Sequence, residues 1–369
     1  MRAYKLVYIT VILICIVTCT VLIMVLPKAE YSADEKRKLT ELPKLTLGNI
    51  STGFYMDELE KYAKDRFPMR KTLVGINSYY SQAMAEGSVY VGKGDYLYTL
   101  PVEFDESRAQ SNISTFEDFA KNCDIDINYI VVPTAGYMMQ DNLPALHRRY
   151  SDGDFLNKLY ERLGAKCIKA DEVLKDKESV FYKTDHHWTS LGAYNVYCAY
   201  MESQNIKPVN ANEYNIETYD GFYGTTYSKS GLWLHGGDTI ELYTGLPGDV
   251  TVTISDDNKE PVSYDDMFFR ENLEGNDRYT VFLNGNHALI KIKNPNADAN
   301  KKLLIIRDSF ASSLAPFLAN HYGEIFLVDL RYYRQNTVSE LVNAEGIDRA
   351  LVVYGIENFS NDSNISRLK

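Results

Sequence analysis

The stretch "KLLIIRDSFASSLAPFLANHYGEIFLVDL", residues 302–330, decides the fold class. Its two ends are apolar and rich in β-branched residues, which predicts two buried strands, and the residues between them predict a helix. "VSELVNAEG" at 338–346 predicts a further helix, and "RALVVYG" at 349–355 predicts a third strand. Because strands and helices alternate here, we expect an α/β fold with a parallel sheet flanked by helices.

The same rhythm occurs earlier in the chain. A helical pattern around residues 109–122 precedes "INYIVVP" at 127–133, which predicts another buried strand. Between the two α/β portions, residues 205–300 show short alternating runs such as "DVTVTI" and "YTVFL". We therefore expect one domain over residues 51–369, in which residues 205–300 form a β-rich insertion.

The N-terminus predicts a membrane anchor. Residues 6–26 hold no charged residue and no proline, and a helix of that length covers the roughly 30 Å hydrocarbon core of a bilayer. Arg2 and Lys5 precede this stretch and favour a cytoplasmic N-terminus. We expect residues 1–27 to be an uncleaved, single-pass signal anchor in the cell membrane, with an extracytoplasmic catalytic domain. Cleavage after the span is the alternative. The charged, proline-containing residues 28–50 read as a linker.

The charge balance argues against nucleic acid as a partner. The chain holds 39 Lys and Arg against 50 Asp and Glu, a formal net charge of −11. A surface of that sign repels a phosphate backbone.

Ser309 lies where the first predicted strand of the opening stretch meets its helix. A serine at such a junction displays its hydroxyl at the carboxyl end of the sheet, where backbone N–H groups of the following helix can stabilise an oxyanion. The alternative is that Asp308 or Ser309 only caps the helix. The catalytic interpretation needs a base.

"DHHW", residues 185–188, can supply that base. In an extended segment, residues two apart project to the same side, so Asp185 and His187 could share a side. The carboxylate would then orient the imidazole and stabilise it when it takes a proton from a serine. His186 would point away. Trp188 could wall the site or contact a sugar face, or it could pack in the core.

Metal binding is the rival interpretation of this segment. Asp185, His186 and His187 resemble a ligand set that His235 and His287 could join. Adjacent histidines rarely present both rings to one ion, however, and no H-E-x-x-H spacing occurs. We expect neither a metal nor another cofactor.

Taken together, these segments resemble the DHHW family, which is related to the alginate O-acetyltransferase proteins of bacterial cell envelopes. The resemblance spans most of the predicted exported part and is carried by "FYMDELEKYAKDRFPMRKTL", "TDHHWTSLGAY", "FYGTTYSKSG" and "RDSFASSLAPFL". It implies an SGNH-hydrolase-like domain with Asp185, His187 and Ser309 as the catalytic acid, base and nucleophile. Ordinary SGNH hydrolases place the serine first, so this order resembles a circular permutation. "RDSF" carries Arg307 where related acetyltransferases have glycine.

Other residues are candidates for substrate or oxyanion contacts. An SGNH-like site needs a glycine N–H and an asparagine side chain besides the serine N–H, and "FLNGNHALIKI" offers Gly285 and Asn286. A tight turn would explain the same two residues without catalysis. Arg331 and Tyr332 follow a predicted strand and therefore lie at the functional edge of the sheet, as substrate contacts or as ordinary surface residues.

The function that the resemblance implies is O-acetylation of a cell-envelope polysaccharide through an acetyl-serine intermediate. It also implies a multi-spanning membrane acyltransferase as the acetyl donor and a glycan as the acceptor. A carbohydrate O-acetyl esterase would use the same three residues with water as acceptor. A non-catalytic glycan-binding or assembly protein of the envelope is the alternative from another class.

Overall fold

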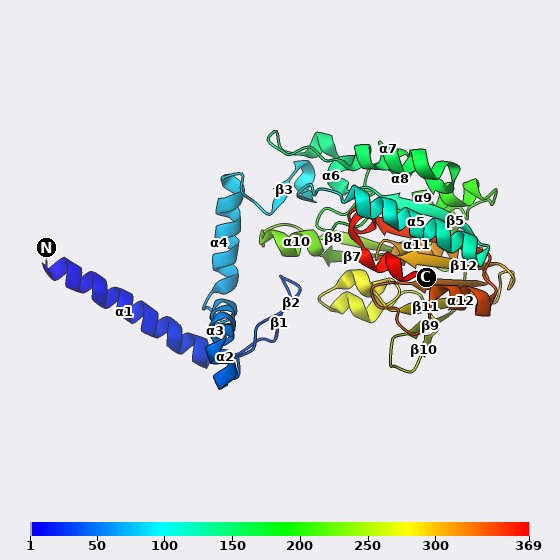
Figure 1. Cartoon of the computed structure of the whole chain (residues 1–369). Coiled ribbons are helices and arrows are strands. Elements are labelled where there is room, and N and C mark those ends of the chain that lie inside the picture. Colours follow the sequence, from blue (N-terminus) through cyan, green and yellow to red (C-terminus); the bar gives the residue numbers. More distant parts are fainter. Residues whose placement is uncertain (1, 369) are drawn as a thin grey trace. The chain divides into compact units, whose positions relative to one another are not determined.

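The computed structural model describes residues 2–368 and divides into two compact units (Figure 1). One unit comprises the chain up to Ser88 together with Ser228–Leu234, and the other comprises Val89–Tyr227 and the chain from His235 onward. The catalytic domain was expected to begin at residue 51, whereas the contacts group residues 51–88 with the N-terminal segment.

The N-terminal unit begins with helix α1, Arg2–Val25. The segment Tyr4–Val25 of this helix is long and apolar enough to cross a membrane. The segment expected to be a linker contains two short paired strands and a short helix. The elements that follow α1 are β1 (Tyr31–Ser32), β2 (Arg37–Lys38), α2 (Leu47–Ser51), α3 (Phe54–Asp65) and α4 (Arg70–Ala83).

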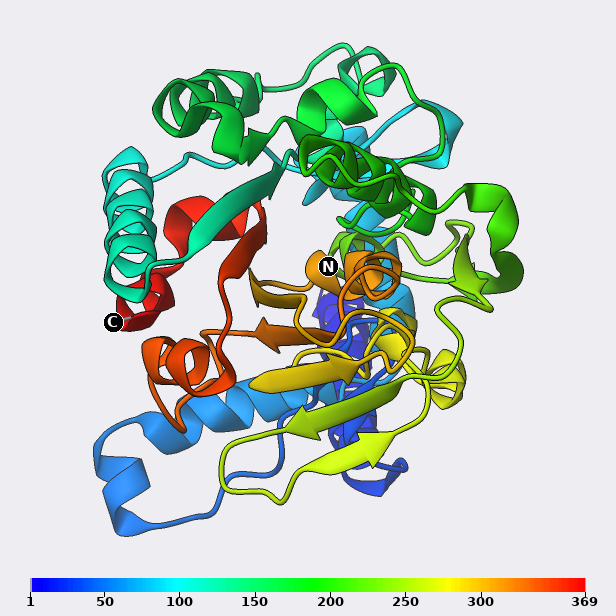
Figure 2. The same cartoon turned by 90° about the vertical axis from the view of Figure 1, so that its right-hand side faces the viewer.

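The larger unit is built on an eight-stranded sheet in the order β10-β9-β11-β13-β12-β14-β5-β6 (Figure 2). The strands are β5 (Asp126–Val132), β6 (Cys167–Ile168), β9 (Thr251–Ser255), β10 (Val262–Tyr264), β11 (Leu289–Lys293), β12 (Lys302–Arg307), β13 (Glu324–Val328) and β14 (Arg349–Gly355). The five strands from β13 to β6 pair in parallel, whereas β11, β9 and β10 add antiparallel strands at the other end. The α/β core expected from the opening stretch is therefore present.

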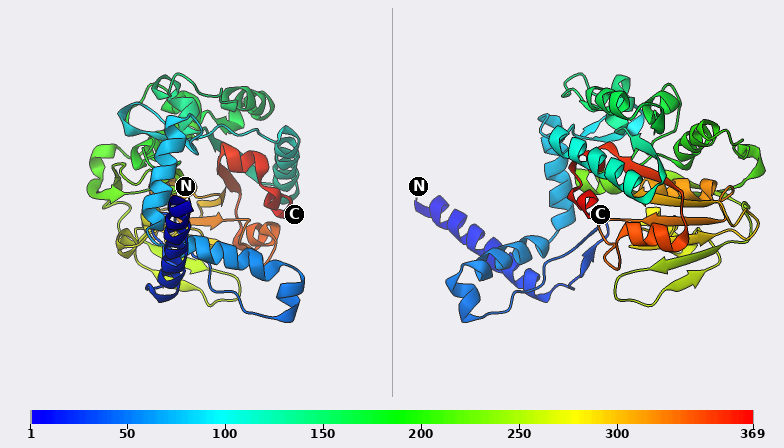
Figure 3. Two further views of the ribbon diagram at one scale, coloured as in Figure 1. Left: turned by 90° about the vertical axis from the view of Figure 1, so that its left-hand side faces the viewer. Right: turned by 45° about the vertical axis from the view of Figure 1, so that its right-hand side comes forward.

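Helices cover both faces of this sheet because its inner strands are apolar on both sides. On β12, Leu303 and Ile305 belong to one buried cluster, while Leu304 and Ile306 belong to the other. Helices α9 (Ser190–Ser203) and α11 (Ala311–Leu318) pack on the first face. The second face is covered by α5 (Glu106–Cys123), α7 (Asp152–Leu163), α12 (Val338–Glu345) and α13 (Ile356–Asn361), and Figure 3 shows teal α5 beside red α13.

The β-rich insertion is continuous with the sheet and is not a separate lobe. Its strands β9, β10 and β11 extend the sheet, and β7 (Asn215–Phe222) pairs with β8 (Asp238–Thr244) as a separate hairpin. A third buried cluster, which includes Phe222, Ile240 and Phe282, forms around this hairpin. The shorter remaining elements are β3 (Val89–Val91), β4 (Leu97–Thr99), α6 (Ala135–Met138), α8 (Ala170–Leu174) and α10 (Thr225–Ser230).

Candidate active site

Ser309 lies two residues beyond the last residue of β12 and two before the first residue of α11. After β12 the chain returns to the sheet at β13, which neighbours β12 on one side. After β5 it returns at β6, which neighbours β5 on the opposite side. In open α/β sheets a crevice forms at the carboxyl ends of the strands where the direction of the connections changes. Ser309 therefore occupies the position in this fold where ligands ordinarily bind.

Asp308 fixes the turn that presents Ser309. One carboxylate oxygen accepts a hydrogen bond from Phe310 N at 3.0 Å, and the other accepts from Gly355 N at 2.9 Å and Asn358 Nδ2 at 2.8 Å. Asp308 is fully buried, and burial raises the pKa of its carboxyl group against the effect of these hydrogen bonds. The strand-to-helix turn after β12 is thereby tied to the one after β14.

The DHHW segment forms a turn, in place of the extended segment in which Asp185 and His187 would share a side. Tyr182 N donates to His187 O at 3.2 Å, and Thr189 N donates to Val180 O at 3.0 Å, so the chain reverses between them. Asp185 lies inside this reversal, and its Oδ1 accepts a hydrogen bond from His187 N at 2.9 Å. The two side chains meet because the turn closes on the carboxylate, and not because alternate residues of a strand share a side.

The three predicted catalytic side chains form one continuous chain of contacts. His187 Nδ1 lies 2.5 Å from Asp185 Oδ1, and His187 Nε2 lies 2.7 Å from Ser309 Oγ. Both Asp185 and His187 are buried. Burial raises the pKa of Asp185, but the charges of His187 and His186 outweigh burial and hold it well below its usual range. An ionised Asp185 accepts the Nδ1 proton and leaves Nε2 to accept the Ser309 hydroxyl proton.

The second oxygen of Asp185 is held by the segment that follows β7. Thr225 N donates to Asp185 Oδ2 at 2.6 Å, and the Thr225 hydroxyl lies 3.1 Å from the same atom. A Cβ atom on Gly224 would lie 2.2 Å from Asp185 Cβ, so only glycine fits there. This segment, "FYGTTYSKSG", carries part of the family resemblance, but its sequence did not predict a role in the site.

Tyr279 is a second residue of the site that sequence reasoning missed. Its ring is stacked on the imidazole of His187, with centroids 3.9 Å apart and planes 6° apart. Its hydroxyl lies 3.1 Å from Ser313 Oγ and 3.4 Å from Ser309 O. Burial raises the pKa of Tyr279, so the hydroxyl stays protonated. The ring of Phe310 contacts His187 edge-on at 4.9 Å between centroids, so aromatic rings confine the imidazole.

The other two residues of DHHW support the site. The ring of His186 lies 3.9 Å from that of His187, and its Nδ1 lies 2.6 Å from Thr225 Oγ1. The expectation that His186 points away is therefore wrong, because the tight turn brings both rings together. Trp188 is fully buried and donates to Ser313 Oγ at 2.9 Å, so in this arrangement it packs in the core and cannot contact a sugar.

Arg307 connects β12 to the predicted oxyanion residues. Its Nη1 lies 3.2 Å from Asn286 Oδ1 and 2.9 Å from Ser312 Oγ, while its Nη2 donates to Gly285 O at 3.2 Å. Gly285 N donates to Phe282 O at 3.1 Å, so the Gly285 N–H is engaged in a turn. The amide of Asn286 is held through its oxygen, and its Nδ2 has no acceptor among residues 2–368.

Arg331 and Tyr332 lie just beyond β13. Arg331 binds Asp329 through two nitrogen atoms, with Nε 2.9 Å from Oδ1 and Nη2 2.6 Å from Oδ2. Asp329 is fully buried, so its charge requires this partner. The Tyr332 side chain is exposed, and the Arg331 guanidinium lies 5.5 Å from its ring centroid.

Asp185, His186 and His187 present donor atoms within 4.8 Å of one another, close enough to hold a metal ion. These atoms are already in use, since Nδ1 of His187 binds Asp185 and Nδ1 of His186 binds Thr225. His287 pairs instead with Asp256, at 3.1 Å. The hydrogen-bonding pattern therefore favours the acid–base arrangement over a metal centre.

This fold and these contacts define the class of the chain: an α/β protein with a serine, histidine and aspartate in contact at the carboxyl end of a parallel sheet. The chain belongs to the DHHW protein family, which residues 82–328 match. The solved DHHW family protein from Eubacterium siraeum is similar over 73% of this chain and 91% of its own, with 22% identity and a TM-score of 0.62.

Two further solved structures are similar. Bacillus cereus PatB1, solved with a sulfonyl adduct, matches 78% of this chain and 100% of its own, with 21% identity and a TM-score of 0.65. The O-acetyltransferase domain of Pseudomonas putida AlgJ matches 75% of this chain and 93% of its own, with 12% identity and a TM-score of 0.43. This similarity is too distant to support an inference. No curated protein matches the chain. The expected family and α/β fold class are confirmed.

The hydrogen-bonding pattern predicts that the site does not retain zinc. After incubation with Zn²⁺ and dialysis, the purified chain should hold no more metal by elemental analysis than the His187→Ala variant does, because ligation would have to break buried hydrogen bonds. Retention of about one zinc per chain, lost in His187→Ala, would restore the metal interpretation.

Proposed function

We propose that the chain is a cell-envelope polysaccharide O-acetyltransferase in which Ser309 carries the acetyl group. The single observation that carries this proposal is the continuous contact from Asp185 through His187 to Ser309 at the carboxyl end of the sheet. A structural role for these residues would not require a buried carboxylate–imidazole pair in contact with a serine hydroxyl.

In the first half-reaction, Ser309 Oγ attacks the carbonyl carbon of an acetyl ester while His187 Nε2 takes the hydroxyl proton. Asp185 stabilises the imidazolium that forms. The tetrahedral intermediate collapses, the donor's C–O bond breaks, and His187 returns the proton to the leaving alcohol. The product is acetyl-Ser309 together with the free donor alcohol.

The second half-reaction reverses these roles. A sugar hydroxyl gives its proton to His187 Nε2 and attacks the carbonyl carbon of acetyl-Ser309. The bond between that carbon and Ser309 Oγ then breaks, Ser309 Oγ takes the proton from His187, and the acetylated sugar leaves. The developing oxyanion needs donors that are free in the resting site. Ser309 N and Asn286 Nδ2 have no acceptor among residues 2–368, which supports them in this role, whereas the Gly285 N–H is occupied.

The acetyl donor and the glycan acceptor remain part of the proposal. An extracytoplasmic enzyme has no access to cytoplasmic thioesters, so a multi-spanning membrane acyltransferase would deliver the acetyl group. Helix α1 fits a single-pass anchor that would hold the chain at the membrane beside such a partner. We place no metal and no cofactor in the mechanism.

The purified chain should release alcohol from a chromogenic acetyl ester in a burst equal to the enzyme concentration, as acetyl-Ser309 accumulates. Ser309→Ala should abolish the burst, and Asp185→Asn should slow it by about 10³- to 10⁴-fold, because an amide no longer favours the reactive tautomer. Stopped-flow absorbance measures both effects.

The matched control is Ser263→Ala, which removes an exposed hydroxyl on β10 and should leave the burst intact. Adding a glycan oligosaccharide should raise turnover and give an acetylated sugar detectable by mass spectrometry. Turnover that yields only acetate would identify an esterase, and the absence of a burst from the folded wild-type chain would identify a non-catalytic protein.

The stacking of Tyr279 on His187 predicts separate effects for its ring and its hydroxyl. Tyr279→Leu should lower the acylation rate about fivefold, because the imidazolium loses an aromatic face worth about 1 kcal/mol. Tyr279→Phe keeps that face and should retain most of the rate. Similar losses in the two variants, with unchanged thermal unfolding, would show that the hydroxyl matters and the stacking does not.

A further inference from the structure

Helix α4 of the N-terminal unit carries an exposed apolar stripe. Leu73, Ile76, Tyr80 and Met84 follow one another at spacings of three and four residues, which places them on one helix face. Their exposed fractions are 47%, 63%, 62% and 56%. No charged residue lies between Thr72 and Ala83. Large apolar side chains in this pattern ordinarily face a partner or a lipid surface.

The other side of α4 is already occupied, so the helix cannot turn its stripe inward. A Cβ on Gly75 would lie 3.0 Å from the ring of Trp233, and Trp233 Nε1 donates to Lys71 O at 3.0 Å. One turn further along, Ser78 packs against Gly231, where a Cβ would lie 2.1 Å from the serine Oγ. The rotation of α4 about its axis is therefore fixed by the segment 228–234.

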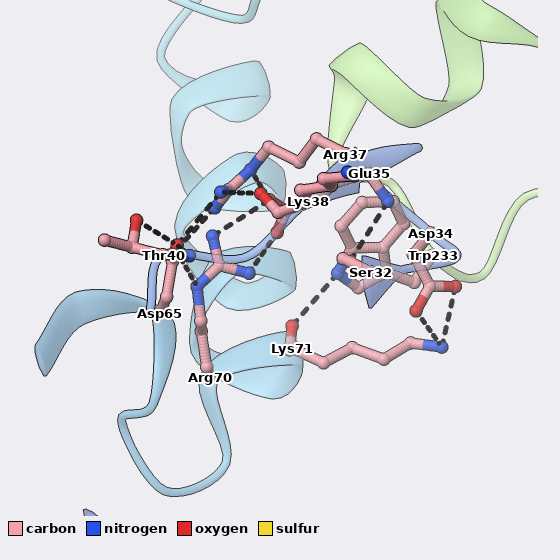
Figure 4. Close-up of polar contacts among 10 residues, drawn as sticks. All are labelled: Ser32, Asp34, Glu35, Arg37, Lys38, Thr40, Asp65, Arg70, Lys71 and Trp233. Carbon is pink, nitrogen blue, oxygen red and sulfur yellow. Dashed lines mark hydrogen bonds and ion pairs between the residues drawn. The ribbon is translucent and has the colours of Figure 1, made fainter. Parts of the chain in front are cut away.

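A cluster of ion pairs reinforces this orientation at the start of α4 (Figure 4). Arg70 binds Glu35, and Lys71 lies 2.9 Å from Asp34. Both cations of α4 are thereby held by the segment that contains β1 and β2. The remaining exposed surface of the helix is uncharged.

The same segment is bound to the end of α3. Arg37 Nη1 and Nη2 lie 3.0 Å and 2.5 Å from the two carboxylate oxygens of Asp65, and Thr40 N donates to Asp65 at 2.8 Å. Hydrogen bonding to Arg37 outweighs burial and lowers the pKa of Asp65. Residues 34–40 therefore connect the end of α3 to the start of α4.

Uncovered apolar surface is concentrated in this unit. Beyond α1, fifteen large apolar residues in 28–88 and 228–234 are strongly exposed, against seven in the much longer remainder of the described chain. The charge differs as well. These two segments hold eleven basic and nine acidic residues, whereas the rest of the chain after residue 88 holds 26 basic and 41 acidic residues. Only the N-terminal unit is therefore suited, by polarity and by charge, to approach an apolar or anionic surface.

We propose that α4 lies on the lipid surface beside its own membrane helix, with Leu73, Ile76 and Tyr80 buried at the boundary between headgroups and acyl chains. Tyrosine and aliphatic side chains on one face of a helix suit that boundary. A shallow, largely apolar groove that includes Phe67 and Leu73 is also lined by Cys19 and Ile23 of α1, so the stripe begins beside the proposed membrane span.

The size of the stripe favours lipid over a protein partner. From Leu73 to Met84 it runs only about 16 Å along the helix. A stable protein interface takes about 800 Å² from each partner, which is more than four side chains supply. A helix that lies on a membrane needs only to insert its apolar face about 5–10 Å into the boundary between headgroups and acyl chains. The contact would hold the unit at the bilayer in addition to α1.

The test places a tryptophan in the stripe of the full chain, reconstituted in vesicles of phosphatidylethanolamine and phosphatidylglycerol with brominated acyl chains. The fluorescence that Ile76→Trp adds to that of the wild-type chain should be quenched several-fold more than the fluorescence added by Val262→Trp. Val262 is a matched control because it is 50% exposed on β10, in the acidic unit. Tyr80→Trp provides a second probe if Ile76→Trp does not fold.

Equal quenching at positions 76 and 262, with folded protein verified by thermal unfolding, overturns the proposal. Chemical cross-linking of the same vesicles decides what covers the stripe instead. Protection of Ile76→Trp from bromine together with cross-linked pairs of chains would assign the stripe to a second copy and would equally overturn the lipid assignment. Neither outcome bears on acetyl transfer, which is measured separately.

Discussion

A buried carboxylate must be paired, and the pairing of Asp185 organises the candidate site. Its two oxygens accept hydrogen bonds from His187 and Thr225, which come from segments about 40 residues apart in sequence. Desolvation alone would favour the neutral acid. The neighbouring imidazoles reverse that preference, so Asp185 stays ionised and fixes the tautomer of His187. The nucleophile's position on the sheet has chemical meaning only because this pair reaches it.

The β-rich insertion therefore completes the site. It supplies Thr225, which donates a hydrogen bond to the Asp185 carboxylate, and Tyr279, whose ring stacks on the His187 imidazole. It also supplies the turn that contains Asn286. Arg307 ties that turn to the end of β12, where related acetyltransferases have glycine. A buried arginine requires acceptors, and the oxygens of Gly285 and Asn286 accept from its two Nη atoms, while its Nε has no hydrogen-bond partner among residues 2–368. Arginine in place of glycine at position 307 is thus accommodated by the insertion. The Ser309 hydroxyl remains in contact with His187.

The strand and helix pattern predicted the α/β core because apolar periodicity records burial directly. It also predicted that Asp185, His187 and Ser309 could act together, and the structure brings them into contact while their catalytic roles remain to be tested. The shape of the turn at DHHW could not be predicted, because hydrogen bonds between residues 180–182 and 187–189 create it. Tyr279 and Thr225 were missed for a similar reason: only tertiary packing brings these residues to the site, and neither belongs to a recognisable spacing.

The central claim is that Ser309 is the nucleophile that His187 activates. Its most direct test is to react the chain briefly with an acetyl ester, quench with acid, and map the modified peptide by mass spectrometry. The account predicts an acetyl group on Ser309 in the wild-type chain, and none on that residue in His187→Ala at the same time point. Acetylation at another residue, or equal labelling of Ser309 in both proteins, would contradict it.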